Sequence, residues 1–201
     1  MGAVKSLRET YAENTRRVLM QTGLELFVQR GYTAVSAEEL VQAAGLSRGA
    51  LYHHFDGKRG LFEAVFQAQE GAASRRVAEA VAAQSDPWQQ AVAGMETFLD
   101  VCCQREYREI VLLQGPIALG WPHWRELDRQ HFAALLVDAT TRLIDAGVIL
   151  ERPAELIAAA AYGMLTELSL TIAAADDPAQ ARTDASALVR SLLTGLAATP
   201  D

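Results

Sequence analysis

One short stretch, SAEELVQAAGLSRGALYHHF, constrains the fold more than any other part of the chain. It opens on Ser36–Glu39, a capping box in which each end residue's side chain satisfies the other's backbone N–H, so a helix is predicted over 37–44. Gly45 can adopt the left-handed backbone that ends a helix. Ser47 is a second cap and predicts another short helix over 48–54. Two short helices around a tight turn have the proportions of a helix-turn-helix.

The remaining segments also predict helices, because their apolar residues recur at helical spacing and no alternating strand pattern or internal repeat appears. Residues 109–121 are expected to be a short apolar piece broken at Gly115-Pro116. The fold class is therefore predicted to be all-α with about nine helices. The other helices are expected at about 6–30, 57–83, 87–104, 123–147, 153–174 and 179–197.

Composition narrows the class of protein. The 201 residues are half hydrophobic and carry a net charge of −7, which argues against a protein that coats nucleic acid indiscriminately. Residues 1–60 nevertheless hold eight Lys and Arg against six Asp and Glu. Cys102 and Cys103 are adjacent and form no disulfide or metal framework. With no secretory signal, and with Glu167 interrupting the most apolar run, a cytoplasmic protein without a membrane span is expected.

The second short helix combines residue types that suit the major groove of DNA, the groove that admits a helix and distinguishes all base pairs. Arg48 can donate two hydrogen bonds to one guanine, and the small residues Gly49 and Ala50 let the helix backbone come close to the bases. Leu51 and Phe55, four residues apart, would face the core. Side chains around this set could bind phosphates or cap helices near them: Ser36, Ser47, Tyr52, His53, His54, Lys58 and Arg59.

The whole run from Thr15 to Phe66 resembles the DNA-binding domain of TetR-type regulators, the tetracycline-repressor-like family. The resemblance is carried by "RGY", by "AAGLS" and by "GALYHHF" followed by Lys58 and "LF". It implies that Ser36, Arg48, Gly49, Ala50, Tyr52, His53, His54 and Lys58 approach DNA, with Tyr52 and Lys58 on phosphates. Two residues depart from the family pattern: Gly60 weakens the first turn of the next helix, and Arg59 adds positive charge.

The resemblance further implies two domains, a helix-turn-helix domain over 1–57 and an effector-binding and dimerisation domain over 58–201. The protein would then be a repressor that binds a palindromic double-stranded operator as a homodimer and is released by a small molecule. The last two helices suit the dimer contact because small side chains let helices approach closely, although an ordinary intramolecular core is the alternative. These small residues are Ala158 to Ala161, Gly163, Ala185, Ala187 and Gly195.

Residues that could line an effector pocket lie on the middle helices, and they favour an apolar or aromatic effector. Plain core packing is the alternative for most of them, and for Glu167 the alternatives are a rim position or an intersubunit salt bridge. The cysteines could sense redox state or be buried structural residues. The pocket candidates are Met95, Phe98, Tyr107, Gln114, Trp121, Trp124, His131, Tyr162 and Glu167.

Two other functions compete with DNA binding. One is an enzyme that uses His53 and His54 or the His123–His131 region, but the chain has no catalytic or nucleotide-binding fingerprint, so no enzyme activity, cofactor or metal is expected. The other is a helical interaction protein with a helix-turn-helix that no longer binds DNA. It would not be retained on DNA even at low salt.

Overall fold

The computed structural model describes residues 7–196. Helix caps and glycines set the helix boundaries in its N-terminal part, which is called the head below. The head holds α1 (Leu7–Arg30), α2 (Ala37–Ala44) and α3 (Arg48–Phe55). The capping box is present: Ser36 Oγ accepts from Glu39 N at 3.1 Å, and Glu39 Oε2 accepts from Ser36 N at 2.8 Å. Gly45 has φ 64°, so the turn ends α2 as predicted. The expected helix start at Ser6 lies outside the described residues.

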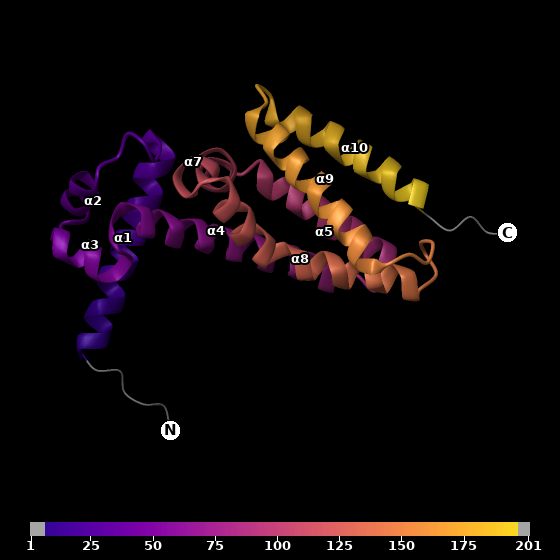
Figure 1. Ribbon diagram of the computed structural model, residues 1–201, viewed down its shortest axis with the longest axis horizontal. Helices are drawn as coiled ribbons and strands as arrows, with labels where there is room; N and C mark the ends of the chain where they lie inside the picture. The colour runs from indigo at the N-terminus through magenta and orange to yellow at the C-terminus, as the bar shows by residue number, and fades with distance from the viewer. Residues whose placement is uncertain (1–6, 197–201) are drawn as a thin grey trace.

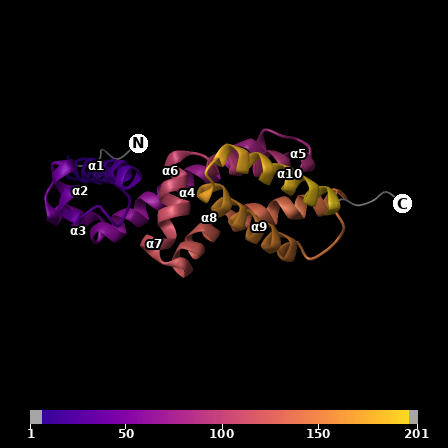
Figure 2. The ribbon, with the colours of Figure 1, turned by 90° about the horizontal axis from the view of Figure 1, so that it is seen from above.

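The body is built on α4 (Gly57–Ala82), which runs from the head along the length of the molecule (Figure 1). At about 1.5 Å per residue its 26 residues span about 39 Å. Helix α4 packs against α5 (Pro87–Cys102) and α8 (Trp121–Asp145), and α9 (Ala154–Ala174) packs against α8, α5 and α10 (Pro178–Leu196). Seen from above, α5, α8, α9 and α10 form a bundle that is separate from the head (Figure 2). The expected helix end at Ala197 lies outside the described residues.

The segment between α5 and α8 differs from the prediction. No break occurs at Gly115-Pro116; instead α6 (Arg105–Tyr107), a π-helix η1 (Arg108–Gln114) and α7 (Gly115–Leu119) follow without interruption. Pro116 has no N–H to donate within this continuous passage, and Val111 O, five residues earlier, accepts from Trp124 Nε1 at 2.8 Å. The chain turns at Gly120 instead, with φ 84°. Gly115 lets this passage approach the body closely, since a Cβ there would lie 2.6 Å from Trp124 Cδ1.

The all-α prediction is confirmed: residues 7–196 contain no β-strand, and with α6, η1 and α7 counted as one passage they form nine helical passages. In this part of the chain, α9 has the length and apolar composition to cross a membrane, and a third of that window is buried against its neighbours (33%). Its contacts with α8, η1 and α10 account for that burial. Helix α9 is therefore an element of the helical body.

One hydrophobic core joins head and body. Phe27 of α1 and Phe62 of α4 meet edge to face with centroids 5.3 Å apart, and Tyr32 lies 5.0 Å from Phe62. Leu51 and Phe55 of α3 are buried in the same core. Each fully buried side chain of this size contributes about 1.5–3 kcal/mol, so α3 is fixed by its inner face and its other face stays available.

Candidate nucleic-acid interface and internal cavity

Helix α3 is divided into an inner and an outer face as its spacing predicts. Leu51 and Phe55 are buried, while Arg48, Gly49 and Tyr52 are exposed, Tyr52 by 47%. The exposed set also includes Ser47 and His53, whereas Ala50 and His54 are half-buried. Most of the candidate DNA-binding side chains therefore share one exposed surface at the end of the head.

Tyr52 is held in place from two sides. The Arg48 guanidinium lies over its ring at 5.5 Å, and a hydrogen bond with Tyr52 is the main cause that raises the pKa of Arg48. Gly57, with φ 89°, allows the ring to pack closely, since a Cβ there would lie 3.2 Å from Tyr52 Cε1. The ring therefore has a defined place between Arg48 and the start of α4 while the residue stays 47% exposed.

The two histidines of α3 differ in their surroundings. Their rings meet edge to face at 5.0 Å. Burial, together with the positive charges of His53 and Arg16, lowers the pKa of His54. His54 is therefore neutral at physiological pH, and it can act on DNA through hydrogen bonds but contributes no charge.

Both predicted caps are engaged within the head. Ser47 Oγ accepts from Ala50 N at 3.3 Å and fixes the start of α3. At the start of α2, the Glu39 carboxylate accepts from Ser36 N and pairs with Arg30 at 2.7 Å, and its pKa falls to about 2, mainly because of the Ser36 hydrogen bonds. This carboxylate occupies one of the amides that a phosphate at Ser36 would use. Each serine keeps its own hydroxyl proton as a donor.

The basic residues at the start of α4 are placed differently from the expectation. Lys58 Nζ donates to the carbonyl oxygens of Tyr32 at 2.9 Å and Val35 at 2.8 Å, and burial lowers its pKa. Arg59 Nη2 donates to Leu119 O at 3.2 Å. Both cations thus bind backbone carbonyl groups of the protein itself. Lys58 ties the α1–α2 loop to α4 and has one of its three N–H donors left for a phosphate.

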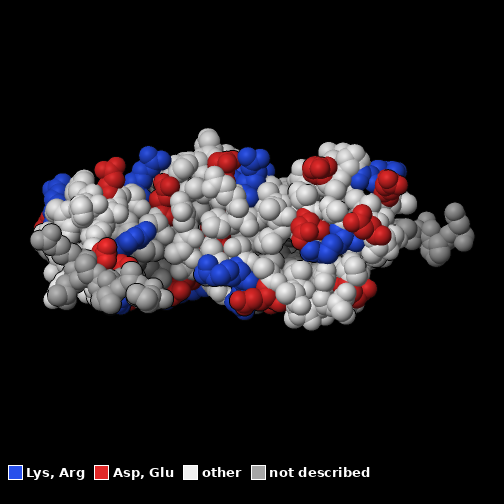
Figure 3. All heavy atoms as spheres, turned by 90° about the horizontal axis from the view of Figure 1, so that it is seen from below, with Lys and Arg blue, Asp and Glu red and all other residues white. Residues whose placement is uncertain are grey.

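Charges of both signs are interspersed over the face of the molecule seen in Figure 3, with no wide field of one sign. Binding of any polyanion at random is not favoured by such a surface. Contact with DNA has to come from the shape and side chains of the head.

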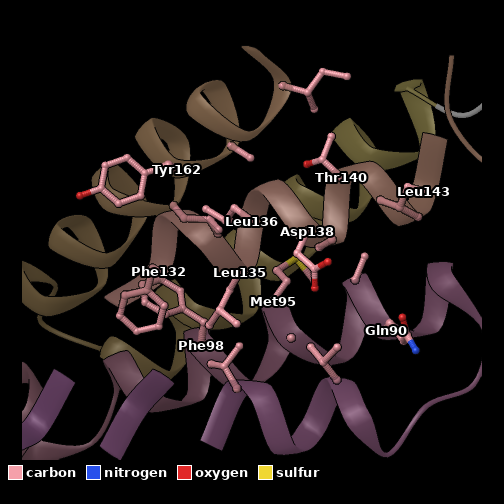
Figure 4. A pocket seen from close by; sticks show the side chains of 18 of the residues that line it. Gln90, Met95, Phe98, Phe132, Leu135, Leu136, Asp138, Thr140, Leu143 and Tyr162 are labelled. Carbon is pink, nitrogen blue, oxygen red and sulfur yellow. The ribbon is translucent and has the colours of Figure 1, made fainter. Parts of the chain in front are cut away.

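The body contains a cavity of about 580 Å³ among α4, α5, α8, α9 and α10, lined mainly by apolar side chains. Its size is in the range of sites for drug-sized molecules. Phe98, Phe132 and Tyr162 lie toward one end of it, and Gln90, Thr140 and Leu143 lie toward the other (Figure 4). Three of the predicted pocket residues, Met95, Phe98 and Tyr162, line this cavity.

The other six predicted pocket residues lie outside the cavity, some bound to other parts of the body and some exposed. Tyr107 is buried and donates to Glu70 Oε2, and Trp124 Nε1 donates to Val111 O at 2.8 Å. Glu167 is exposed on the outer surface of α9. The remaining three are exposed Trp121, half-buried His131 and buried Gln114.

Gln114 connects the head to the body. Its Oε1 accepts from Tyr32 N at 2.8 Å, and its Nε2 donates to Phe27 O at 2.9 Å. Phe27 belongs to the last turn of α1 and Tyr32 to the loop that follows it, while Gln114 closes the π-helix η1, which packs against α9. A displacement of η1 or α9 would therefore reach the head through this amide.

A buried acid pair stands at the aromatic end of the cavity. Glu70 of α4 is 0% exposed and Asp128 of α8 is 6% exposed, and Asp128 lines the cavity. Tyr107 OH donates to Glu70 at 3.1 Å, and Tyr162 OH donates to Asp128. Burial and the charge of Asp128 raise the pKa of Glu70 well above its usual value, and burial raises that of Asp128. Each carboxyl group contributes to the pKa shift of the other, so the two acids are close neighbours in the buried interior.

Sequence reasoning missed this pair, although a signal was present. Glu70 occupies a stripe at i+4 spacing with Phe62 and Phe66, and Asp128 lies between Trp124 and Phe132 at the same spacing. A carboxylate on an apolar stripe must be partnered or protonated when the stripe is buried. Periodicity alone could have identified both acids, but not that they meet.

Comparisons with known proteins agree with this architecture. Residues 88–196 match the family described as "Tetracyclin repressor-like, C-terminal domain", and residues 19–65 match "Bacterial regulatory proteins, tetR family". A TetR-family transcriptional regulator from Pectobacterium atrosepticum has a crystal structure with a TM-score of 0.84 to this chain, at 29% identity over 98% of this chain and 100% of that one.

Relatives with assigned names are similar over shorter stretches. The HTH-type transcriptional regulator SrpR of Pseudomonas putida is 27% identical over 114 residues, 57% of this chain and 53% of SrpR. The HTH-type transcriptional repressor AcnR of Corynebacterium glutamicum is 40% identical over 68 residues, 34% of each chain. This chain thus spans about half of the first relative and a third of the second.

Proposed function

The chain belongs to the TetR family of bacterial regulatory proteins and is a transcriptional regulator with a DNA-binding helix-turn-helix, and from this premise we propose that it is a ligand-released repressor. The observation that carries the proposal is that α3 has a buried face and an exposed face. Leu51 and Phe55 pack into the core, whereas Arg48, Gly49 and Tyr52 are exposed. Arg48 reads a guanine, and Tyr52 binds a phosphate. Among the relatives, AcnR is named a repressor and FasR of Mycolicibacterium smegmatis an activator, so repression is the proposed direction, and expression of a reporter gene behind a bound DNA fragment should fall when the chain is present.

We propose a homodimer formed through α9 and α10. Leu156 of α9 and Leu188 and Leu192 of α10 are 67%, 48% and 47% exposed, an unusual amount of apolar surface on neighbouring helices. Exposed small residues such as Ala159 and Ala187 would let two such surfaces approach closely. A two-fold dimer places two α3 helices on one side of the molecule, which accounts for a palindromic operator.

We propose a boundary between a DNA-binding domain over 1–57 and an effector and dimerisation domain over 58–201. The start of α4 at Gly57 supports this division, since α4 passes from the head into the wall of the cavity. A ligand in the cavity would move α4 or the Gln114 contact and change the separation of the two α3 helices. Such a regulator works in the cytoplasm, where the DNA is.

The test starts by selecting genomic fragments that bind the full chain and then measuring affinity and its salt dependence for variants. Tyr52→Phe should weaken binding to all sequences, because a phosphate contact carries no sequence information. Arg48→Ala should relax base preference by about 1–3 kcal/mol at one position and lessen the salt slope. Arg152→Ala, a charge-matched change on the exposed loop between α8 and α9, is the control.

If both α3 variants bound DNA as the parent does while Arg152→Ala weakened binding, α3 would not be the reading element. If no fragment were retained even at low salt, the helical interaction protein would be the better description. Sedimentation of Leu188→Glu tests the dimer separately, since a charge there should produce monomers.

A further inference from the structure

The chemistry of the cavity wall indicates what kind of molecule it holds. Among the described residues that line the cavity, the charged side chains are Asp128, Asp138 and Arg142. Arg142 already pairs with Asp138, so no cation of the lining is left for Asp128. Asp128 is therefore the one acidic group of the lining that has no basic partner within the lining.

The positive groups nearest to Asp128 do not neutralise it from within. Arg125 is outside the cavity lining and lies over the Tyr162 ring at 5.2 Å, while the Tyr162 hydroxyl donates to Asp128. Burial and the charge of Arg75 lower the pKa of His131, while Asp128 acts in the opposite direction, and the net shift is downward. The other titratable groups that face the acid pair are neutral: Tyr107, Tyr162 and Cys102.

Hydrogen-bonding capacity at the cavity is also one-sided. Behind Asp128, which lines the cavity, Glu70 Oε1 is buried and receives no hydrogen bond. At the far end, Gln90 Oε1 is buried with no donor. Acceptors without donors favour a ligand that brings its own N–H groups.

The aromatic end of the cavity adds a further preference for positive charge. Phe98 and Phe132 meet edge to face at 5.2 Å, and with Tyr162 they gather at the end where Asp128 lies (Figure 4). Ring faces attract cations, and the attraction grows when water is excluded.

We propose that the cavity binds an apolar organic cation, with its ammonium group against Asp128 of the Glu70–Asp128 pair and its hydrocarbon part along the apolar wall. The proposal rests on the proposed function only in taking the cavity as the effector site. Glu70 belongs to α4, the helix that begins directly after α3, so the ammonium would act on the element that positions the DNA-reading helix.

Three probes of equal length separate charge from hydrophobicity: 6-phenylhexylamine, 6-phenylhexan-1-ol and 6-phenylhexanoate. Their affinities for the full chain are measured by calorimetry. We expect the amine to bind at least about tenfold more tightly than the alcohol, and the carboxylate to bind most weakly. Equal or tighter binding of the alcohol or the carboxylate would overturn the proposal, as would the absence of any amine binding.

Variants assign the preference to the pair. Asp128→Asn should remove the amine's advantage over the alcohol, whereas Glu126→Gln, which removes one exposed charge from the same helix, should retain it. An advantage that survived in Asp128→Asn would refute the assignment. Circular dichroism checks that this variant folds.

A second variant keeps the test decisive if Asp128→Asn does not fold. Raising the pH through the raised pKa of Glu70 ionises this group in the parent and should increase the amine's advantage. Glu70→Gln places a permanent amide there and should abolish that increase, and an increase of the same size in this variant would also refute the proposal.

If the amine binds as expected but DNA affinity does not change, the ligand class stands and the effector role in the proposed function fails. If the amine has no advantage while the α3 variants behave as expected, the ligand class fails alone.

Discussion

Gly60→Ala should destabilise the protein, although alanine is the better helix former. A Cβ on Gly60 would lie 1.5 Å from the carbonyl oxygen of Phe55 and 2.7 Å from its carbon, far inside contact distance. These are backbone atoms, so no rotamer change relieves the overlap, and the end of α3 must move away from the start of α4. Overpacking of this kind costs about 1–3 kcal/mol, and the upper end applies here. The gain in helix propensity is about 0.5–1 kcal/mol, so a net loss of about 2 kcal/mol is expected.

The assay is urea unfolding of the full chain followed by far-UV circular dichroism, with thermal unfolding as a second measure. A loss of about 2 kcal/mol lowers the melting temperature by about 4–8 °C for a chain of this size. Gly49→Ala is the matched control, because the nearest atom to its added Cβ is Ser47 Oγ at 3.7 Å. That variant should be as stable as the parent or gain up to about 1 kcal/mol. Equal stability of the two variants would refute the packing argument at Gly60.

Three further predictions follow from the same contacts. Lys58→Met should lose about 1–3 kcal/mol of unfolding free energy, because two loop carbonyls lose a charged donor; unchanged urea unfolding would contradict this. The raised pKa of Glu70 makes its contribution to stability greatest at low pH and lost as the pH rises through the raised value, so the parent should lose stability relative to Glu70→Gln as the pH increases. A constant difference across the titration would be inconsistent with the buried acid. Burial raises the pKa of both Cys102 and Cys103, so an aromatic disulfide reagent should label them slowly in the native protein and fast in denaturant; fast native labelling would favour a redox sensor.

Local signals were sufficient for most of the helices and for α3. Caps such as Ser36 and Ser47 act within one turn, and the four-residue spacing of Leu51 and Phe55 gives the buried face wherever the helix lies. The prediction failed at Gly115-Pro116, where a π-helix ahead of the proline shifted the register so that the chain stayed helical. A π-helix adds one residue to a helical turn, and so short an insertion cannot be recognised from the spacing of apolar residues in the sequence.

The sequence by itself determined that the chain is helical, that its second and third helices form a helix-turn-helix, and which side of the third faces outward. Tertiary structure decided what each polar group meets: Lys58 turns to two loop carbonyls, Gln114 joins the head to the body, and Glu70 meets Asp128. Helical periodicity assigns a side chain to a face of its own helix, because that depends on residues a few positions away. It cannot identify the facing helix, since that neighbour is set by how all the apolar faces are buried together.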